Sequence, residues 1–192
     1  MKFGIHLSAW SSEWGDNVIS NIDRVANIGY DGVEIPIMNS DQFPVSRAKK
    51  ELERNDLRLT TGTGLSEETD IASDNPKKRK AGRRHLKQCI EIGSKLGSSL
   101  LGGVIYAPWG KHFNQKRERY DRFIAEFQKV AAIASENDVR LAMEIINRYE
   151  TNFLNTVDQG QKILADLNSD NVGLHLDTYH ANIEETGVPD AI

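Results

Sequence analysis

Short aliphatic runs alternate with longer helical segments along the chain. Six runs have the composition and length of β-strands, at residues 3–8, 32–37, 57–62, 100–106, 140–146 and 172–177. The helical segments between them cover residues 16–29, 45–55, 76–97, 119–137 and 156–168. Helix C-caps are expected at Asn55-Asp56, Gly97 and Asn137-Asp138. This alternation predicts a single α/β domain with parallel strands and right-handed crossovers.

The spacing of the strands favours one of two α/β architectures. A (β/α)8 barrel of ~250 residues has ~31 residues in each unit, and six predicted strands within residues 3–177 fit that rate. A doubly wound sheet shows similar alternation. However, the first loop of a dinucleotide-binding fold carries G-x-G-x-x-G, and "HLSAWSSEWG" (residues 6–15) lacks this motif. The sequence therefore favours the TIM barrel.

Polar residues interrupt four of the predicted strands on one face. Successive side chains of a strand point to opposite faces, so the aliphatic residues of these strands share one face that can pack under outer helices. The other face carries His6, Glu34, Glu144, His175 and Asp177. Active sites of TIM barrels lie at the C-terminal ends of the strands, and we therefore expect these side chains to converge in the barrel mouth.

Each of these residues also has a structural interpretation. His6 alone is more often a hydrogen-bonded core histidine than a ligand, and His175 is expected to be packed and hydrogen-bonded. Glu34 can bond a neighbouring loop. Two buried carboxylates on adjacent strands, Glu144 and Asp177, need a shared compensating cation or hydrogen bonds. A hard divalent metal with oxygen ligands is slightly favoured over a structural salt bridge.

Composition and charge narrow the classes of partner. The net charge of -4 gives no general attraction to nucleic acid or to an anionic membrane. The basic run at residues 76–85 has no interleaved aromatic residues and is interpreted as a solvated helix face. Neither a signal peptide nor an apolar run approaching ~20 residues is present, so we expect a cytoplasmic protein. Cys89, the single cysteine, excludes an internal disulfide and is expected to be buried on a helix.

Two later stretches are more specific than a general barrel pattern. They are "MEIINRYETNFLNT" (143–156) and "GLHLDTYHANIEE" (173–185), and "MKFGIHLSAW" and "YDGVEIPI" fit with them. Across all 192 residues the chain resembles the ketose 3-epimerases, the D-tagatose/D-psicose (allulose) group of the xylose-isomerase-like TIM barrels. This resemblance implies metal-dependent epimerisation of a free ketose at C3, by proton exchange through an enediolate.

The resemblance also implies roles for particular residues. Glu144 corresponds to a metal ligand that exchanges a proton with the substrate, and Asp177 corresponds to a second metal ligand. The implied cofactor is a divalent metal, with Mn²⁺ expected in preference to Co²⁺ or Mg²⁺. The full-length parent is expected to be a homo-oligomer. The implied substrate-binding residues are His6, Trp14, Trp109, Glu150 and His180.

Part of the family pattern is not found in these residues. In the family, a histidine on strand seven and a glutamate on strand eight complete the metal site, and the glutamate is the second acid–base group. We therefore expect residues 1–192 to be the N-terminal part of a TIM barrel, without strands seven and eight, and to be inactive alone. A hydroxypyruvate isomerase or inosose dehydratase type remains an alternative. So does a non-catalytic truncated barrel, including one that another chain completes.

Overall fold

Six parallel strands form one curved sheet in the computed structural model, which describes residues 2–11, 16–114 and 116–191. The strands are β1 (Gly4–His6), β2 (Gly32–Pro36), β3 (Arg58–Gly62), β4 (Leu100–Gly103), β5 (Arg140–Ile145) and β6 (Val172–Leu176). They pair in chain order from β1 to β6. A parallel sheet whose strands follow the chain order is the arrangement of a TIM barrel, and the predicted fold class is confirmed.

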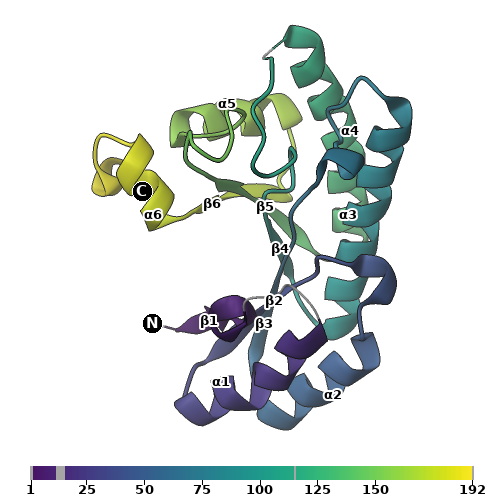
Figure 1. The fold of residues 1–192 in the computed structure, drawn as a ribbon, viewed down its shortest axis with the longest axis vertical. Coiled ribbons are helices and arrows are strands. Elements are labelled where there is room, and N and C mark those ends of the chain that lie inside the picture. Colours follow the sequence, from purple (N-terminus) through teal and green to yellow (C-terminus); the bar gives the residue numbers. More distant parts are fainter. Residues whose placement is uncertain (1, 12–15, 115, 192) are drawn as a thin grey trace.

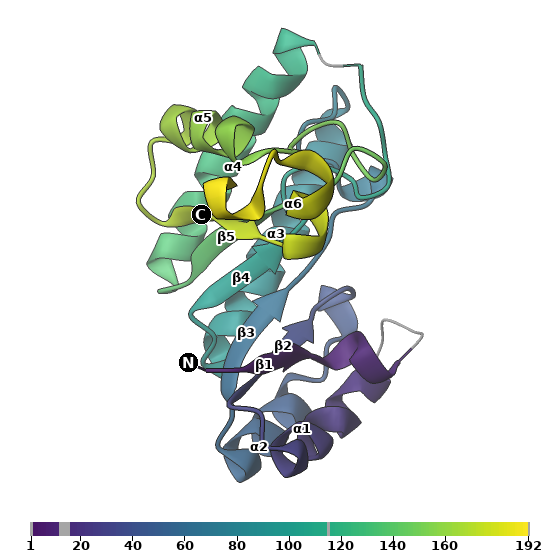
Figure 2. The ribbon, with the colours of Figure 1, turned by 90° about the vertical axis from the view of Figure 1, so that its left-hand side faces the viewer.

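Helices cover the convex side of this sheet. They are α1 (Ile22–Ile28), α2 (Val45–Asn55), α3 (Pro76–Leu96), α4 (Arg117–Glu136) and α5 (Val157–Leu167), whereas the short helix α6 (Thr178–Glu184) follows β6 on the open side (Figure 1). Neighbouring helices from α1 to α5 pack against one another in chain order. The edge strands β1 and β6 and both ends of the chain lie on the open side (Figures 1 and 2). Among the described residues, no helix combines the length and apolarity that crossing a bilayer requires.

The hydrophobic core fills the space between the sheet and the outer helices. Strand residues that point outward are buried in it, including Val33, Ile35, Leu141, Met143 and Ile145. Burying such an aliphatic side chain contributes roughly 1.5–3 kcal/mol. The predicted orientation of the aliphatic faces is thus confirmed for the central strands. Phe3, the first residue of the strand predicted at 3–8, is an exception with 61% of its surface exposed, because it precedes the edge strand β1.

The structure confirms that Cys89 is buried on a helix and that helices end at the predicted C-caps. Cys89 is fully buried on α3, and burial raises the pKa of its thiol to about 12. Such a thiol is a packed apolar group and not a nucleophile. The C-caps Asp56 and Gly97 adopt left-handed backbone conformations, with φ of 48° and 85°, and Asn137 caps α4.

Several predicted boundaries differ from the structure. Residues 16–29 do not form one α-helix, because residues Asp16–Asn21 form a 3-10 helix before α1. The first strand ends at His6, where another 3-10 helix, Leu7–Trp10, begins. Strand β4 ends at Gly103, whose φ of 110° is incompatible with extended backbone. A Cβ at that position would stand 2.3 Å from the carbonyl oxygen of Thr63, so only glycine allows this close approach.

Candidate functional site

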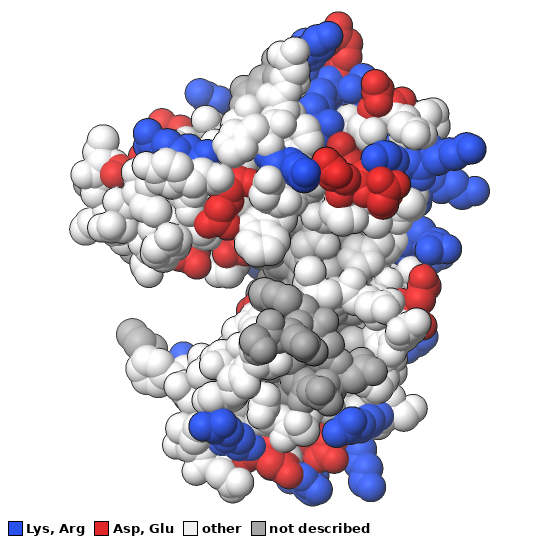
Figure 3. Space-filling model, in the orientation of Figure 1, with Lys and Arg blue, Asp and Glu red and all other residues white. Residues whose placement is uncertain are grey.

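A cleft of about 720 Å³ opens among the loops that follow the strands. The predicted residues His6, Glu34, Trp109, Glu144, Glu150 and His180 are among those that line it. The space-filling view shows the molecule hollowed between the part that carries β1 and the part that carries β6, with carboxylates on one rim (Figure 3). The convergence expected from strand alternation is therefore found for residues of β1, β2 and β5.

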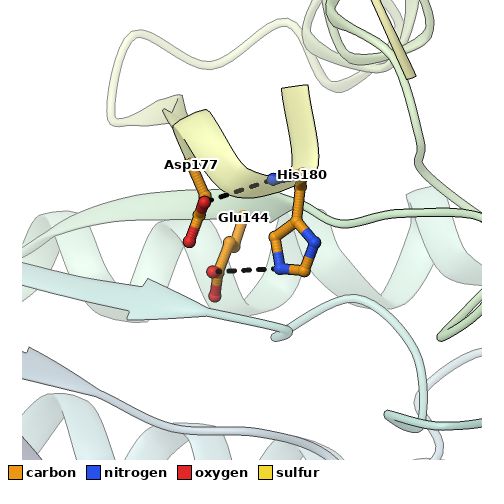
Figure 4. Close-up of side chains that lie close together, drawn as sticks. All are labelled: Glu144, Asp177 and His180. Carbon is orange, nitrogen blue, oxygen red and sulfur yellow. Dashed lines mark hydrogen bonds and ion pairs between the residues drawn. The ribbon is translucent and has the colours of Figure 1, made fainter. Parts of the chain in front are cut away.

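Two carboxylates and an imidazole meet at the ends of β5 and β6. Glu144 lies on β5, Asp177 directly follows β6, and His180 lies in the first turn of α6 (Figure 4). One potential ligand atom from each residue lies within 4.8 Å of the others. His180 lies on α6, a helix that is not among those expected from the sequence.

Asp177 has a structural role in addition to its position in this cluster. Its Oδ1 accepts hydrogen bonds from the backbone N–H groups of Tyr179, at 2.6 Å, and His180, at 3.3 Å. These bonds make Asp177 the N-cap of α6, and they turn His180 back toward Glu144. The bonds occupy Oδ1, and no described residue donates a hydrogen bond to Oδ2.

The Glu144 carboxylate is half-buried and accepts no hydrogen bond from any described residue. Burial raises its pKa, while His175 and His180 act in the opposite direction and Asp177 and Glu34 add to the increase. Partial burial without a hydrogen-bond donor is costly for an ionised carboxylate. Oxygen donors from Glu144 and Asp177 are the ligands that hard divalent cations prefer, so these residues fit such a cation.

A hydrogen-bonded chain runs along the other side of the cluster. The Trp109 indole N–H donates to Glu150 Oε2 at 2.7 Å, although the Trp109 side chain is 53% exposed. Glu150 Oε1 accepts from the Asn147 amide at 2.8 Å, and the same amide contacts His180 Nδ1 at 2.8 Å. Sequence reasoning missed Asn147. It lies within the stretch "MEIINRYETNFLNT" (143–156), but no local pattern indicates that its side chain is buried.

Three predicted residues remain. His6 and Glu34 lie in the wall of the cleft, and Trp14 lies outside the described residues. His6 Nε2 lies 3.8 Å from Glu34 Oε1, and Thr60 donates to Glu34 at 3.2 Å. Burial lowers the pKa of His6, and the nearby Glu34 partly offsets this effect.

His175 differs from its predicted role. It pairs in register with Glu144, but its side chain is only half-buried and makes no hydrogen bond to a described residue. The prediction of a packed, hydrogen-bonded histidine is therefore wrong for the described part of the chain. The reason is that β6 is an edge strand, so its inward face has a neighbouring strand on one side only.

Comparison with known proteins identifies relatives of the chain. A family model described as a xylose isomerase-like TIM barrel matches residues 22–192. A ketose 3-epimerase of Arthrobacter globiformis is 35% identical over 97% of this chain and 65% of its own length. An L-ribulose 3-epimerase of Methylomonas sp. (strain DH-1) is 35% identical over 100% of this chain and 68% of its own length. The chain thus spans about two thirds of the length of these relatives.

Solved structures agree with the sequence relatives. The crystal structure of a D-allulose 3-epimerase from Methylomonas sp., in complex with D-allulose, superposes with a TM-score of 0.93 at 35% identity. The match covers 100% of this chain and 69% of that one. The resemblance seen in the two sequence motifs is therefore confirmed. The chain belongs to the xylose isomerase-like TIM barrel family, within the group of the ketose 3-epimerases.

Proposed function

We propose that these residues form the N-terminal part of a metal-dependent ketose 3-epimerase, which inverts a free ketose at C3. The observation that carries this proposal is the cluster of Glu144, Asp177 and His180 at the ends of adjacent parallel strands. Relatives named ketose, L-ribulose and D-psicose 3-epimerases support the substrate class. Their greater length supports the proposal that strands seven and eight of the barrel lie outside residues 1–192.

In this proposal Glu144 and Asp177 bind a divalent cation, and Mn²⁺ is preferred over Co²⁺ or Mg²⁺. Their carboxylates supply oxygen ligands, and Asp177 Oδ2, to which no described residue donates a hydrogen bond, is available without loss of the helix cap. A bound cation stabilises negative charge that develops on the ketone and neighbouring hydroxyl oxygens.

Glu144 acts as the base on one face of the sugar. The proton on C3 is acidic because it is adjacent to the C2 ketone. When the Glu144 carboxylate takes this proton, the C–H electron pair forms the C2–C3 double bond, and the π pair of the C2=O bond moves onto its oxygen to give an enediolate. Burial raises the pKa of Glu144 above the ordinary value of a glutamate. A second acid–base group, outside these 192 residues, returns a proton to the opposite face and so inverts C3.

The remaining polar residues of the cleft bind the substrate in this proposal. Glu150 and His180 are connected through Asn147, and both face the space beside Glu144. His6 and Trp109 line the same cleft and contact other parts of the sugar. Trp14 is assigned to the same apolar wall as Trp109 by family resemblance alone.

The full-length protein loaded with Mn²⁺ should interconvert a ketose and its C3 epimer. In deuterated water the product should carry deuterium at C3, because solvent exchanges with the acid–base groups between the two proton transfers. NMR spectroscopy of D-fructose, D-psicose, D-tagatose and L-ribulose reactions measures this exchange. Turnover of hydroxypyruvate or an inosose, with no ketose exchange, would support the alternative isomerase or dehydratase types instead.

Replacing His180 with alanine should lower ketose turnover in the full-length enzyme far more than it lowers metal content. The expected reduction is about 10²–10³-fold, the typical cost of losing one donor to a developing oxyanion. The bound Mn²⁺ is measured by atomic absorption on the same samples used for kinetics. Parallel loss of metal and activity would show that His180 is a metal ligand.

A further inference from the structure

The orientation of the Asn147 side-chain amide is determined by its neighbours. Asn147 is 1% exposed and lies just beyond β5. Its Oδ1 accepts a hydrogen bond from the backbone N–H of Tyr149 at 2.9 Å. Its Nδ2 lies 2.8 Å from Glu150 Oε1, and a carboxylate only accepts hydrogen bonds. Exchanging the amide oxygen and nitrogen would break both contacts, so Nδ2 must face Glu150 and, with it, His180.

Two N–H donors from Asn147 therefore converge on one nitrogen of His180. The side-chain Nδ2 lies 2.8 Å from His180 Nδ1, and the backbone N–H of Asn147 donates to the same atom at 3.2 Å. Glu150 Oε1 is 3.9 Å from Nδ1, too far to compete as an acceptor. Nδ1 must supply a lone pair to these donors, and the neutral imidazole then carries its hydrogen on Nε2.

The protonated nitrogen faces the cleft. Nε2 lies 4.0 Å from Glu144 Oε1, beyond hydrogen-bond distance, and both side chains line the cleft. We propose that Asn147 is a positioning residue that fixes the His180 tautomer, so that an N–H and not a lone pair points at the substrate. The catalytic half of this inference rests on the proposed function, in which that N–H donates to the oxygen that becomes negative.

This tautomer also gives His180 a different role from the two carboxylates of the cluster. A ring nitrogen that carries a hydrogen has no lone pair for a cation, so His180 is a donor beside the carboxylates and not a third ligand. The same Asn147 amide bonds Glu150, which in turn accepts from Trp109. One buried amide thus orients Glu150 and His180, two of the groups that are proposed to contact the substrate.

The tautomer can be measured without any turnover. The full-length protein is labelled with ¹⁵N-histidine, freed of metal with a chelator, and studied by long-range ¹H–¹⁵N NMR at a pH where imidazole is neutral. The His180 signals are assigned from their loss in a His180→Gln variant. We expect an unprotonated Nδ1 and a protonated Nε2 in the wild type. A protonated Nδ1 in the wild type would overturn the inference, whatever the variants do.

An Asn147→Asp variant tests whether this residue causes the preference. Its carboxylate has the shape of the amide but only accepts, so at the shorter 2.8 Å contact it should favour a protonated Nδ1, although the backbone N–H at 3.2 Å remains. The matched control is Asn152→Asp in the same loop, where the side chain bonds the backbone of Phe113. The control should keep the wild-type tautomer. An unchanged tautomer in folded Asn147→Asp protein, or the same change in the control, contradicts the assignment to Asn147.

Kinetics then separate the inference from the proposed function. In Asn147→Asp the ketose kcat/KM should fall by about 10²–10³-fold, with Mn²⁺ content unchanged. A changed tautomer with near wild-type kcat/KM would overturn the positioning role while leaving the epimerase proposal intact. A wild-type enzyme that shows the expected tautomer but turns over no ketose would contradict the proposed function and support the structural half of the inference.

Discussion

Replacing Glu144 with glutamine should reduce ketose epimerisation by ~10⁴-fold or more. Losing a general base typically costs about 10²–10⁴-fold in rate, and Glu144 is also a proposed metal ligand, so two effects combine. Glutamine has the same shape but takes no proton at neutral pH and is a weaker ligand for a hard cation. The fold should survive, because no described residue donates a hydrogen bond to the carboxylate that would be lost.

Three measurements on the Glu144→Gln variant separate these contributions. Turnover of D-fructose or D-psicose gives the total effect, deuterium exchange at C3 reports the proton transfer, and Mn²⁺ content reports the ligand role. Glu136→Gln, an exposed carboxylate at the end of α4, is the matched control and should behave as the wild type. Near wild-type C3 exchange in Glu144→Gln would show that another residue removes the proton.

Replacing Asp177 with asparagine should abolish metal-dependent activity while α6 stays folded. The reason is that the two carboxylate oxygens differ: Oδ1 accepts from the Tyr179 and His180 backbones, whereas no described residue donates to Oδ2, the proposed ligand atom. Asparagine is as good an N-cap as aspartate, so its amide oxygen keeps the cap while the charge is lost. Metal affinity measured by titration calorimetry with Mn²⁺ should fall sharply, with little change in thermal unfolding.

Two further variants complete the Asp177 experiment. Asp177→Ala should lose the cap as well and destabilise α6, at a typical cost of ~1 kcal/mol. Asp158→Asn, which removes an exposed carboxylate from the first turn of α5, should leave both metal affinity and activity unchanged. Wild-type Mn²⁺ affinity in Asp177→Asn would show that Asp177 caps the helix and binds no metal.

Local periodicity accounts for the parts of the fold that sequence reasoning predicted correctly. The strand–helix alternation predicted a parallel sheet, and the sheet has its strands in chain order. The two-residue repeat of a strand placed Glu144 on the face opposite Met143 and Ile145, which are buried under the helices. Both features depend only on residues close together in the chain, so a single sequence contains them.

Sequence-based predictions failed where the position of a strand in the sheet, or the backbone at the start of a helix, determined the result. Phe3 and His175 alternate as residues of central strands do, but β1 and β6 are the edges of the sheet, and these side chains are more exposed than predicted. Helix α6 was missed because its seven residues are too few for a clear helical period. The Asp177 cap, which starts this helix, became visible only with its backbone geometry.

By itself, then, the sequence determined the barrel class, the inward carboxylates Glu144 and Asp177, and the family resemblance. Only the tertiary structure decided how His180 is held, because its partner Asn147 is 33 positions away along the chain. Their hydrogen bonds require the loop after β5 and the first turn of α6 to pack together. Such contacts follow from the relative placement of two strand ends, which no repeat in the local sequence encodes.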